Sequence, residues 1–195
     1  VESLSDLRVR QALSYGIDKE ALISTVYGEG KAYICDDVFP GNHWSHSESV
    51  TKYEYNPEKA KALLEEAGYT MNASTGIYEK DGQPLHLTYD MFTSTDGRSI
   101  AALIQQQWKE IGVDMEVIEQ DFAVLAYEKL LPGEASEETT ADSFQCYTLG
   151  FGVEADPQEY NEYFSTSTGA GSWNFIHYSN PQVDQLFKDQ LLLSD

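Results

Sequence analysis

The sequence predicts the α/β fold class, with a small mixed sheet flanked by helices. Segments of helical periodicity alternate with short segments of alternating hydrophobicity, and a strand, a helix and a strand follow one another at 85–92, 97–111 and 113–119. Such a crossover is almost always right-handed and joins parallel strands. The length of 195 residues fits one domain, so residues 1–195 are expected to form a single α/β lobe.

Two helices are expected at the start of the chain. Ser5 is the expected N-cap of a helix at 5–15, and Gly16 ends it. Asp18 is the expected N-cap of the second helix, which Gly28 closes. The chain therefore enters its first long irregular segment only after two helices.

Residues 29–55 show no hydrophobic periodicity and are expected to form a long loop, and loops of this length are often functional. The loop contains the stretch CDDVFPGNHWSH, in which His43 and His46 lie close to acidic residues. This combination can bind zinc or nickel, but no helix or strand would fix the ligands. A metal-binding module using His43 and His46 is therefore an alternative, while solvated loop residues are the favoured interpretation.

The clearest local signal is a helix at 56–69. Asn56 is its expected N-cap, and Pro57 occupies its first position, where a proline is well tolerated. A β-hairpin follows, with strands at 76–80 and 85–92 and a turn at Asp81-Gly82.

The second half of the chain continues the alternation of helices and strands. A helix is expected near 121–130, an acidic loop at 132–142, a third strand at 143–149 and a last helix from Asn180-Pro181. Both ends are abrupt, since the chain opens directly on a helix and stops just after another. No signal peptide is recognised, and a lobe of a longer protein is expected.

Charge and cysteine content limit the possible functions. The formal net charge is −21, which argues against nucleic acid or anionic lipid as a partner and is compatible with a cationic or zwitterionic ligand. Cys35 and Cys146 are outside any CxxC pattern, and the sequence leaves open whether they form a disulfide. No apolar run approaches the roughly 18 residues of a membrane span.

The stretch GFGVEADP, residues 150–157, carries the candidate functional side chains. Asp156 before Pro157 fits the N-cap of a helix at 157–164, which gives Asp156 a structural explanation. Glu154 has no such explanation, and it follows the end of a strand, where open α/β sheets bind ligands. A carbohydrate hydrolase using Glu154 and Asp156 is an alternative, but neighbouring alternate side chains point the same way and cannot flank a glycosidic bond.

Several motifs together resemble the family 5 solute-binding proteins of bacterial peptide ABC transporters. The resemblance covers nearly the whole chain, in order, and as a set the motifs are highly specific. They are LSDLRVRQALSYGIDKEALISTVYGEGKA (4–32), YEYNPEKAKALLEEAGY (53–69), DGQPLHLTYDMF (81–92), IAALIQQQWKEIGVDMEV (100–117) and FIHYSNPQVDQLF (175–187).

The resemblance implies a type II periplasmic-binding-protein-like lobe, the second of two lobes that close around a solute. It implies binding without catalysis or a cofactor, an N-terminal lobe and a permease as partners, and a place outside the cytoplasm, in the periplasm or on a lipoprotein anchor. The ligand is expected to be a short peptide or a related small solute.

In the family, an aromatic–Gly–x–acid segment holds the amino terminus of the peptide. Onto this sequence it carries over as Phe151 and Glu154, with Gly152 and Val153 between them. Phe replaces a common Trp and Glu a common Asp, and the stretch before the Asp-Pro is shorter, so Asp156 is the alternative partner of the amine.

Overall fold

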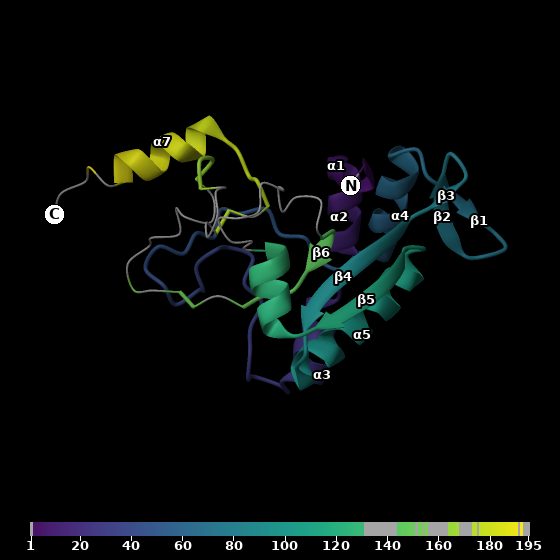
Figure 1. Cartoon of the computed structure of the whole chain (residues 1–195), viewed down its shortest axis with the longest axis horizontal. Helices are drawn as coiled ribbons and strands as arrows, with labels where there is room; N and C mark the ends of the chain where they lie inside the picture. Colours follow the sequence, from purple (N-terminus) through teal and green to yellow (C-terminus); the bar gives the residue numbers. More distant parts are fainter. Residues whose placement is uncertain are drawn as a thin grey trace.

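The fold is an α/β arrangement with two small sheets (Figure 1). The computed structural model describes residues 2–130, 144–150, 152–153, 155, 164–167, 173–174, 176–190 and 192. Their helices are α1 (Glu2–Ser5), α2 (Leu7–Tyr15), α3 (Lys19–Val26), α4 (Pro57–Glu66), α5 (Thr95–Glu110), the π-helix η1 (Val124–Leu130) and α7 (Pro181–Gln190). Their strands are β1 (Thr70–Asn72), β2 (Ile77–Lys80), β3 (Gln83–Pro84), β4 (His86–Phe92), β5 (Asp114–Gln120) and β6 (Cys146–Tyr147).

The parallel sheet has the strand order β5-β4-β6 and confirms the predicted crossover. β4 and β5 pair in parallel from His86 opposite Asp114 to Phe92 opposite Gln120, and α5 connects them. In Figure 1 the two strands lie side by side with α5 along them. Their shared direction places the carboxyl ends of both strands at one edge of the sheet.

The main core lies between the sheet and the helices. Alternate residues of β4 pack against α5, and Tyr89 meets Trp108 edge to face with ring centroids 6.3 Å apart. The Trp108 indole N–H donates to the Leu13 carbonyl at 3.1 Å, which joins α5 to α2. The opposite side of β4 meets η1, where Leu125 and Leu130 form a second cluster.

The N-terminal helices differ in one detail from the prediction. The helix expected at 5–15 is divided into α1 and α2, and Asp6 rather than Ser5 caps α2. The Asp6 carboxylate accepts from the Arg8 amide and pairs with the Arg8 guanidinium, whose hydrogen bond lowers the pKa of Asp6 to about 2. The caps predicted at Asp18 and Asn56 are confirmed.

The predicted hairpin is only partly correct, because the strand at 85–92 does not stay with the strand at 76–80. β2 pairs with the two-residue β3, and β1 completes the antiparallel sheet β1-β2-β3. Leu85 is where the chain changes partner. Its N–H donates to the Tyr78 carbonyl at 2.7 Å, while its carbonyl accepts from Asp114 at 3.0 Å.

The remaining elements confirm the predicted order at their described residues. The helix expected near 121–130 is η1, the loop at 29–55 contains no helix or strand, and the last helix is α7. The third strand is shorter than expected, at Cys146–Tyr147. Residues 131–143 and 156–163, which contain the expected acidic loop and most of the expected helix at 157–164, lie outside the described residues.

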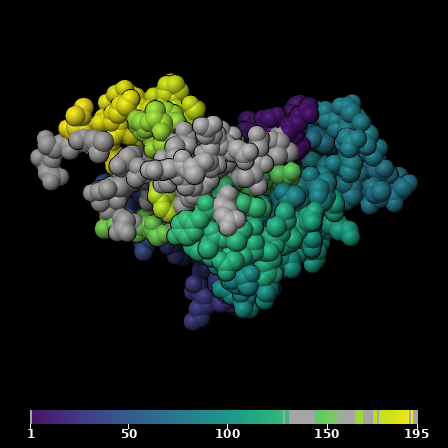
Figure 2. Space-filling model, in the orientation of Figure 1, coloured from purple at the N-terminus to yellow at the C-terminus, as the bar shows by residue number. Residues whose placement is uncertain are grey.

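The sheets and α7 occupy opposite parts of the view. In Figure 2 the yellow atoms of the C-terminal region lie at one end of the visible face and the blue-green atoms of the β1–β3 sheet at the other. Within the part of the chain that the structure describes, no helix is long and apolar enough to cross a membrane.

Candidate functional site

The candidate site begins where β6 leaves the parallel sheet. β6 pairs in parallel with β4, with Cys146 opposite Tyr89 and Tyr147 opposite Asp90. The Thr148 amide then donates to the Asp90 carbonyl at 3.1 Å. The chain therefore leaves the sheet at the carboxyl end of β4, the edge at which open α/β sheets bind ligands.

Side chains from β4 and η1 fix the approach to this segment. The Gln145 side-chain oxygen accepts from the Thr88 amide at 2.8 Å, and the Tyr89 hydroxyl bonds to the Thr148 hydroxyl. Leu149 packs against the cluster of Leu125 and Leu130 on η1. The start of the segment is thus held on both faces of β4.

Asp90 is a buried carboxylate at the same edge, and no sequence pattern points to it. Only 1% of Asp90 is exposed; its Oδ1 accepts from the Gln120 side-chain Nε2 at 2.9 Å and forms an ion pair with Lys129. Among the described residues its Oδ2 has no hydrogen-bond partner. A buried carboxylate needs such compensation, so Lys129 ties η1 to the sheet beside the candidate segment.

The structure also answers the question of the two cysteines. Cys35 and Cys146 are both free thiols. Burial, with a smaller contribution from the nearby Asp90 charge, raises the pKa of the Cys146 thiol to about 11. At neutral pH Cys146 is therefore a protonated, unreactive thiol that serves the packing of β6.

The predicted ligand-binding residues are only partly visible. Phe151, Glu154 and Asp156 lie outside the described residues, whereas Gly152 and Val153 are described and exposed, Val153 by 40%. Both residues follow the anchored Thr148 and Leu149 within a few positions of sequence.

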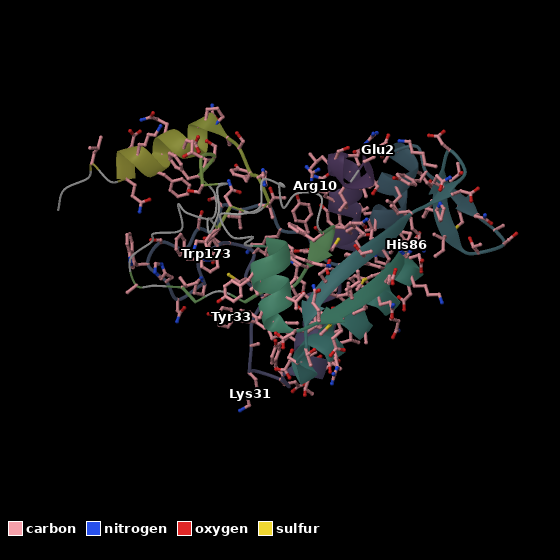
Figure 3. All side chains as sticks on the ribbon, in the orientation of Figure 1. Glu2, Arg10, Lys31, Tyr33, His86 and Trp173 are labelled. Carbon is pink, nitrogen blue, oxygen red and sulfur yellow. The ribbon has the colours of Figure 1, made fainter. Side chains whose placement is uncertain are left out.

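The long loop at 29–55 reaches this segment. The Trp44 indole N–H donates to the Ala155 carbonyl at 2.9 Å, across 111 positions of sequence. The Trp44 ring stacks on His43, which in turn stacks on Phe39. Figure 3 labels Lys31 and Tyr33 at the start of this loop, with Lys31 pointing away from the body. The hydrogen bond from Trp44 to Ala155 is a specific contact between the long loop and the candidate segment.

His43 and His46 are engaged within the loop. His46 Nδ1 donates to the Phe39 carbonyl at 2.9 Å and its Nε2 bonds to Glu48 at 3.2 Å, while His43 Nδ1 accepts from the Ser45 amide at 3.1 Å. In the described ranges no group of three or more His, Cys, Asp or Glu could hold a metal ion. The alternative of a metal-binding module receives no support from these residues.

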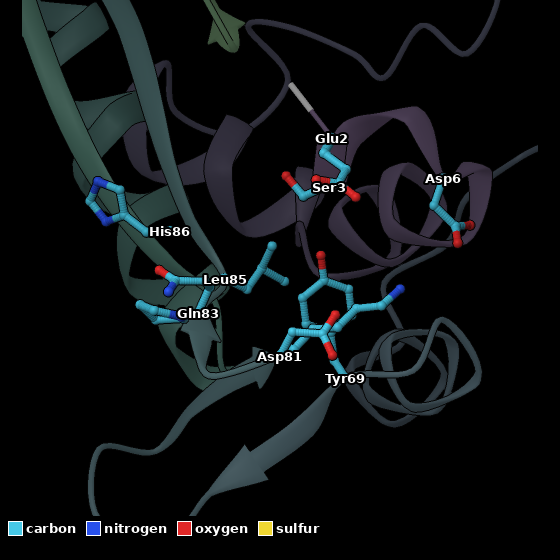
Figure 4. Close-up of a pocket in the computed structure, with 10 residues that line it drawn as sticks. Glu2, Ser3, Asp6, Tyr69, Asp81, Gln83, Leu85 and His86 are labelled. Atoms are coloured by element: carbon cyan, nitrogen blue, oxygen red, sulfur yellow. The ribbon is translucent and has the colours of Figure 1, made fainter.

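Cavities lined by described residues also occur away from the candidate segment. One, of about 320 Å³, lies between α1 and the β2–β3 turn and is lined by Glu2, Tyr69 and His86 among others (Figure 4). His86 begins β4, so this cavity is at the amino edge of the parallel sheet, opposite to where such folds bind ligands. Another, of about 530 Å³, is lined by α3 and the 29–55 loop and contains the Lys19–Asp36 ion pair.

Known proteins are similar to this chain in both sequence and fold. Residues 1–172 match the family "Bacterial extracellular solute-binding proteins, family 5 Middle". The oligopeptide-binding protein AppA of Bacillus subtilis is 30% identical over 197 residues, which cover 100% of this chain and 34% of AppA. The structure of AppA from Bacillus subtilis in complex with a nonapeptide gives a TM-score of 0.85 at 29% identity, covering 100% of this chain and 37% of that chain.

A second solved structure with a different ligand is also similar. NikZ from Campylobacter jejuni in complex with Ni(L-His) gives a TM-score of 0.81 at 26% identity, covering 100% of this chain and 37% of that chain. The fold is therefore that of the type II periplasmic binding proteins. The chain belongs to the bacterial extracellular solute-binding proteins of family 5, and it spans about a third of the length of the curated relatives AppA and heme-binding protein A of Haemophilus influenzae.

Proposed function

We propose that these residues form the ligand-binding lobe of an ABC-transporter substrate-binding protein that captures short peptides or a related small solute for import. The observation that carries the proposal is that the chain leaves the parallel sheet at its carboxyl edge at Thr148, just before the stretch 150–157, in a chain of this family. AppA, an oligopeptide-binding protein, supports peptides as the first class of solute to test.

The ligand's amino terminus is bound by a carboxylate of this segment. Glu154 is the first candidate, Asp156 is the alternative, and Phe151 is the aromatic residue of the same proposed motif. Gly152 and Val153 present exposed backbone for main-chain contacts with an extended peptide. A charge-assisted hydrogen bond to an ammonium group contributes about 1.5–3 kcal/mol, and the net charge of −21 favours a cationic group over an anionic one.

The rest of the cleft is supplied by a second, N-terminal lobe of the same protein. The fraction of AppA that this chain covers, 34%, leaves room for such a lobe. The two lobes close on the solute, and the closed form is recognised by the permease outside the cytoplasm. No catalysis is proposed, because the family to which the chain belongs consists of solute-binding proteins.

Charge-neutralising variants of the full-length protein test the role of the segment. Glu154→Gln is expected to weaken peptide affinity by about 10- to 150-fold, because it removes the charge that pairs with the ammonium. Asp156→Asn keeps a good N-cap and is the matched control. Calorimetry with the peptide that gives the largest thermal shift in a tryptic digest of casein measures both.

The two variants separate the two assignments. A large loss in Asp156→Asn alone assigns the ammonium to Asp156. Wild-type affinity in both variants contradicts a carboxylate of this segment as the partner of the ligand.

A further inference from the structure

We infer that Trp44 is a positioning residue for the ligand-binding segment, holding the Ala155 carbonyl and with it the backbone between Glu154 and Asp156. The inference rests on the proposed function of that segment. The bond runs from the Trp44 indole N–H to the Ala155 oxygen at 2.9 Å, well within the range of a normal hydrogen bond. It joins the 29–55 loop to the one residue that lies between the two candidate carboxylates.

The described residues of the segment, Gly150, Gly152, Val153 and Ala155, are all exposed. A Cβ placed on Gly150 or on Gly152 would meet no atom within 4 Å. Glycines also give the backbone wide conformational freedom. An external hydrogen bond therefore has a large effect on where the adjacent side chains point.

The loop is built to hold the indole in place. Trp44 stacks on His43 with ring centroids 5.9 Å apart, and His43 stacks on Phe39 at 4.8 Å. Asp37 stabilises the same loop, because its two carboxylate oxygens accept from the backbone amides of Val38 and Ser47, each at 2.7 Å. The donor is thus fixed by its own loop before it meets the segment.

The exposure of Trp44 indicates that its role is directional rather than hydrophobic. The side chain is 75% exposed, so it buries little apolar surface for the core. A tryptophan is enriched where an apolar ring and a polar N–H are both used, and here the N–H is the part with a defined partner. Since a carboxylate binds an ammonium best with correct geometry, fixing Ala155 sets the direction from which Glu154 or Asp156 approaches the ligand.

The test is backbone amide exchange in the ligand-free, full-length protein. Trp44→Phe keeps an aromatic ring on the stack and removes the N–H. We expect the amides of residues 150–155 to exchange about 2- to 12-fold faster, the factor that corresponds to the loss of one hydrogen bond, with an unchanged melting temperature. Tyr33→Phe, an equally small change on the same exposed loop, is the control and is expected to leave these amides unchanged.

Two results would overturn the inference. One is wild-type exchange at 150–155 in Trp44→Phe; the other is faster exchange confined to residues 35–48, which would make Trp44 a structural residue of its own loop. A parallel thermal-shift measurement with a tryptic digest of casein keeps the proposed function separate. No shift in the wild type contradicts peptide binding, while amide exchange still decides the role of Trp44.

Discussion

Single residues at the carboxyl edge of the sheet explain how the candidate segment is held. Asp90 is the one charged side chain that is fully buried within the described ranges, and its partner Lys129 comes from η1, 39 positions later. Removing one partner of such a pair leaves an uncompensated buried charge. This pair is not predictable from local sequence patterns, because only the packing of η1 on β4 brings the two residues together.

His46 gives the 29–55 loop a dependence on pH. The hydrogen bond to the Phe39 carbonyl raises the pKa of His46, and Glu48 and Asp37 raise it further, while Lys52 pairs with Glu48 on the outer side. Only the protonated imidazole donates from both nitrogens, to Phe39 and to Glu48. The stabilisation is therefore fully present below the unfolded pKa of about 6.5 and is lost as the pH rises through the higher folded pKa.

Replacing His46 tests this dependence. His46→Asn in the full-length protein is expected to reduce the free energy of unfolding more at about pH 5.5 than at about pH 8.5, because Asn carries no charge at either pH. Urea unfolding of wild type and variant at both pH values measures it. Parallel pH profiles for the two proteins would show that His46 does not supply the dependence.

At the scale of elements, the turn between α5 and β5 connects the crossover helix to the parallel sheet and depends on Gly112. Gly112 has a φ of +78°, and a Cβ there would lie 2.7 Å from the Tyr78 ring. Its carbonyl also accepts from the Tyr78 amide at 2.8 Å, which joins the two sheets. The turn therefore needs glycine both for its backbone conformation and for the space.

Two glycine variants separate these two requirements. Gly112→Ala is expected to destabilise the fold by about 2–3 kcal/mol, from left-handed strain and from the clash with Tyr78. Gly82→Ala is the matched control, because Gly82 has a φ of +76° with no atom near its Cβ position, and is expected to cost about 1 kcal/mol. Chemical denaturation measures both. Equal losses would mean that the contact with Tyr78 contributes nothing.

Sequence patterns within a few positions predicted most of the helices and strands but few of the long-range contacts between them. The caps at Asp18 and Asn56 and the crossover around α5 follow from periodicity and turn residues, which act within a few positions. The switch of partner at Leu85 was not predictable in this way, because it depends on a hydrogen bond to Asp114 across the crossover. The contact of Trp44 with Ala155 is of the same long-range kind, and only the general tendency of long loops to be functional pointed to it.

At the scale of the whole molecule, we propose that these residues form one wall of a binding cleft. β6 leaves the carboxyl edge of the parallel sheet, Trp44 of the 29–55 loop contacts Ala155, and Lys129 of η1 pairs with Asp90 at the same edge. Without the proposed second lobe, a bound solute lacks the contacts that the other side of the cleft would provide. The 195-residue chain alone is therefore expected to bind peptides weakly or not at all.

The most direct measurement identifies the solute that the full-length protein carries. The protein is purified without added ligand and without chelators, denatured, and the released small molecules are analysed by mass spectrometry. Short peptides are the expected result, and adding them back should raise the melting temperature by mass action. Release of a different solute, such as a nickel complex or a sugar, with no thermal shift from any short peptide, would contradict peptide capture as the function.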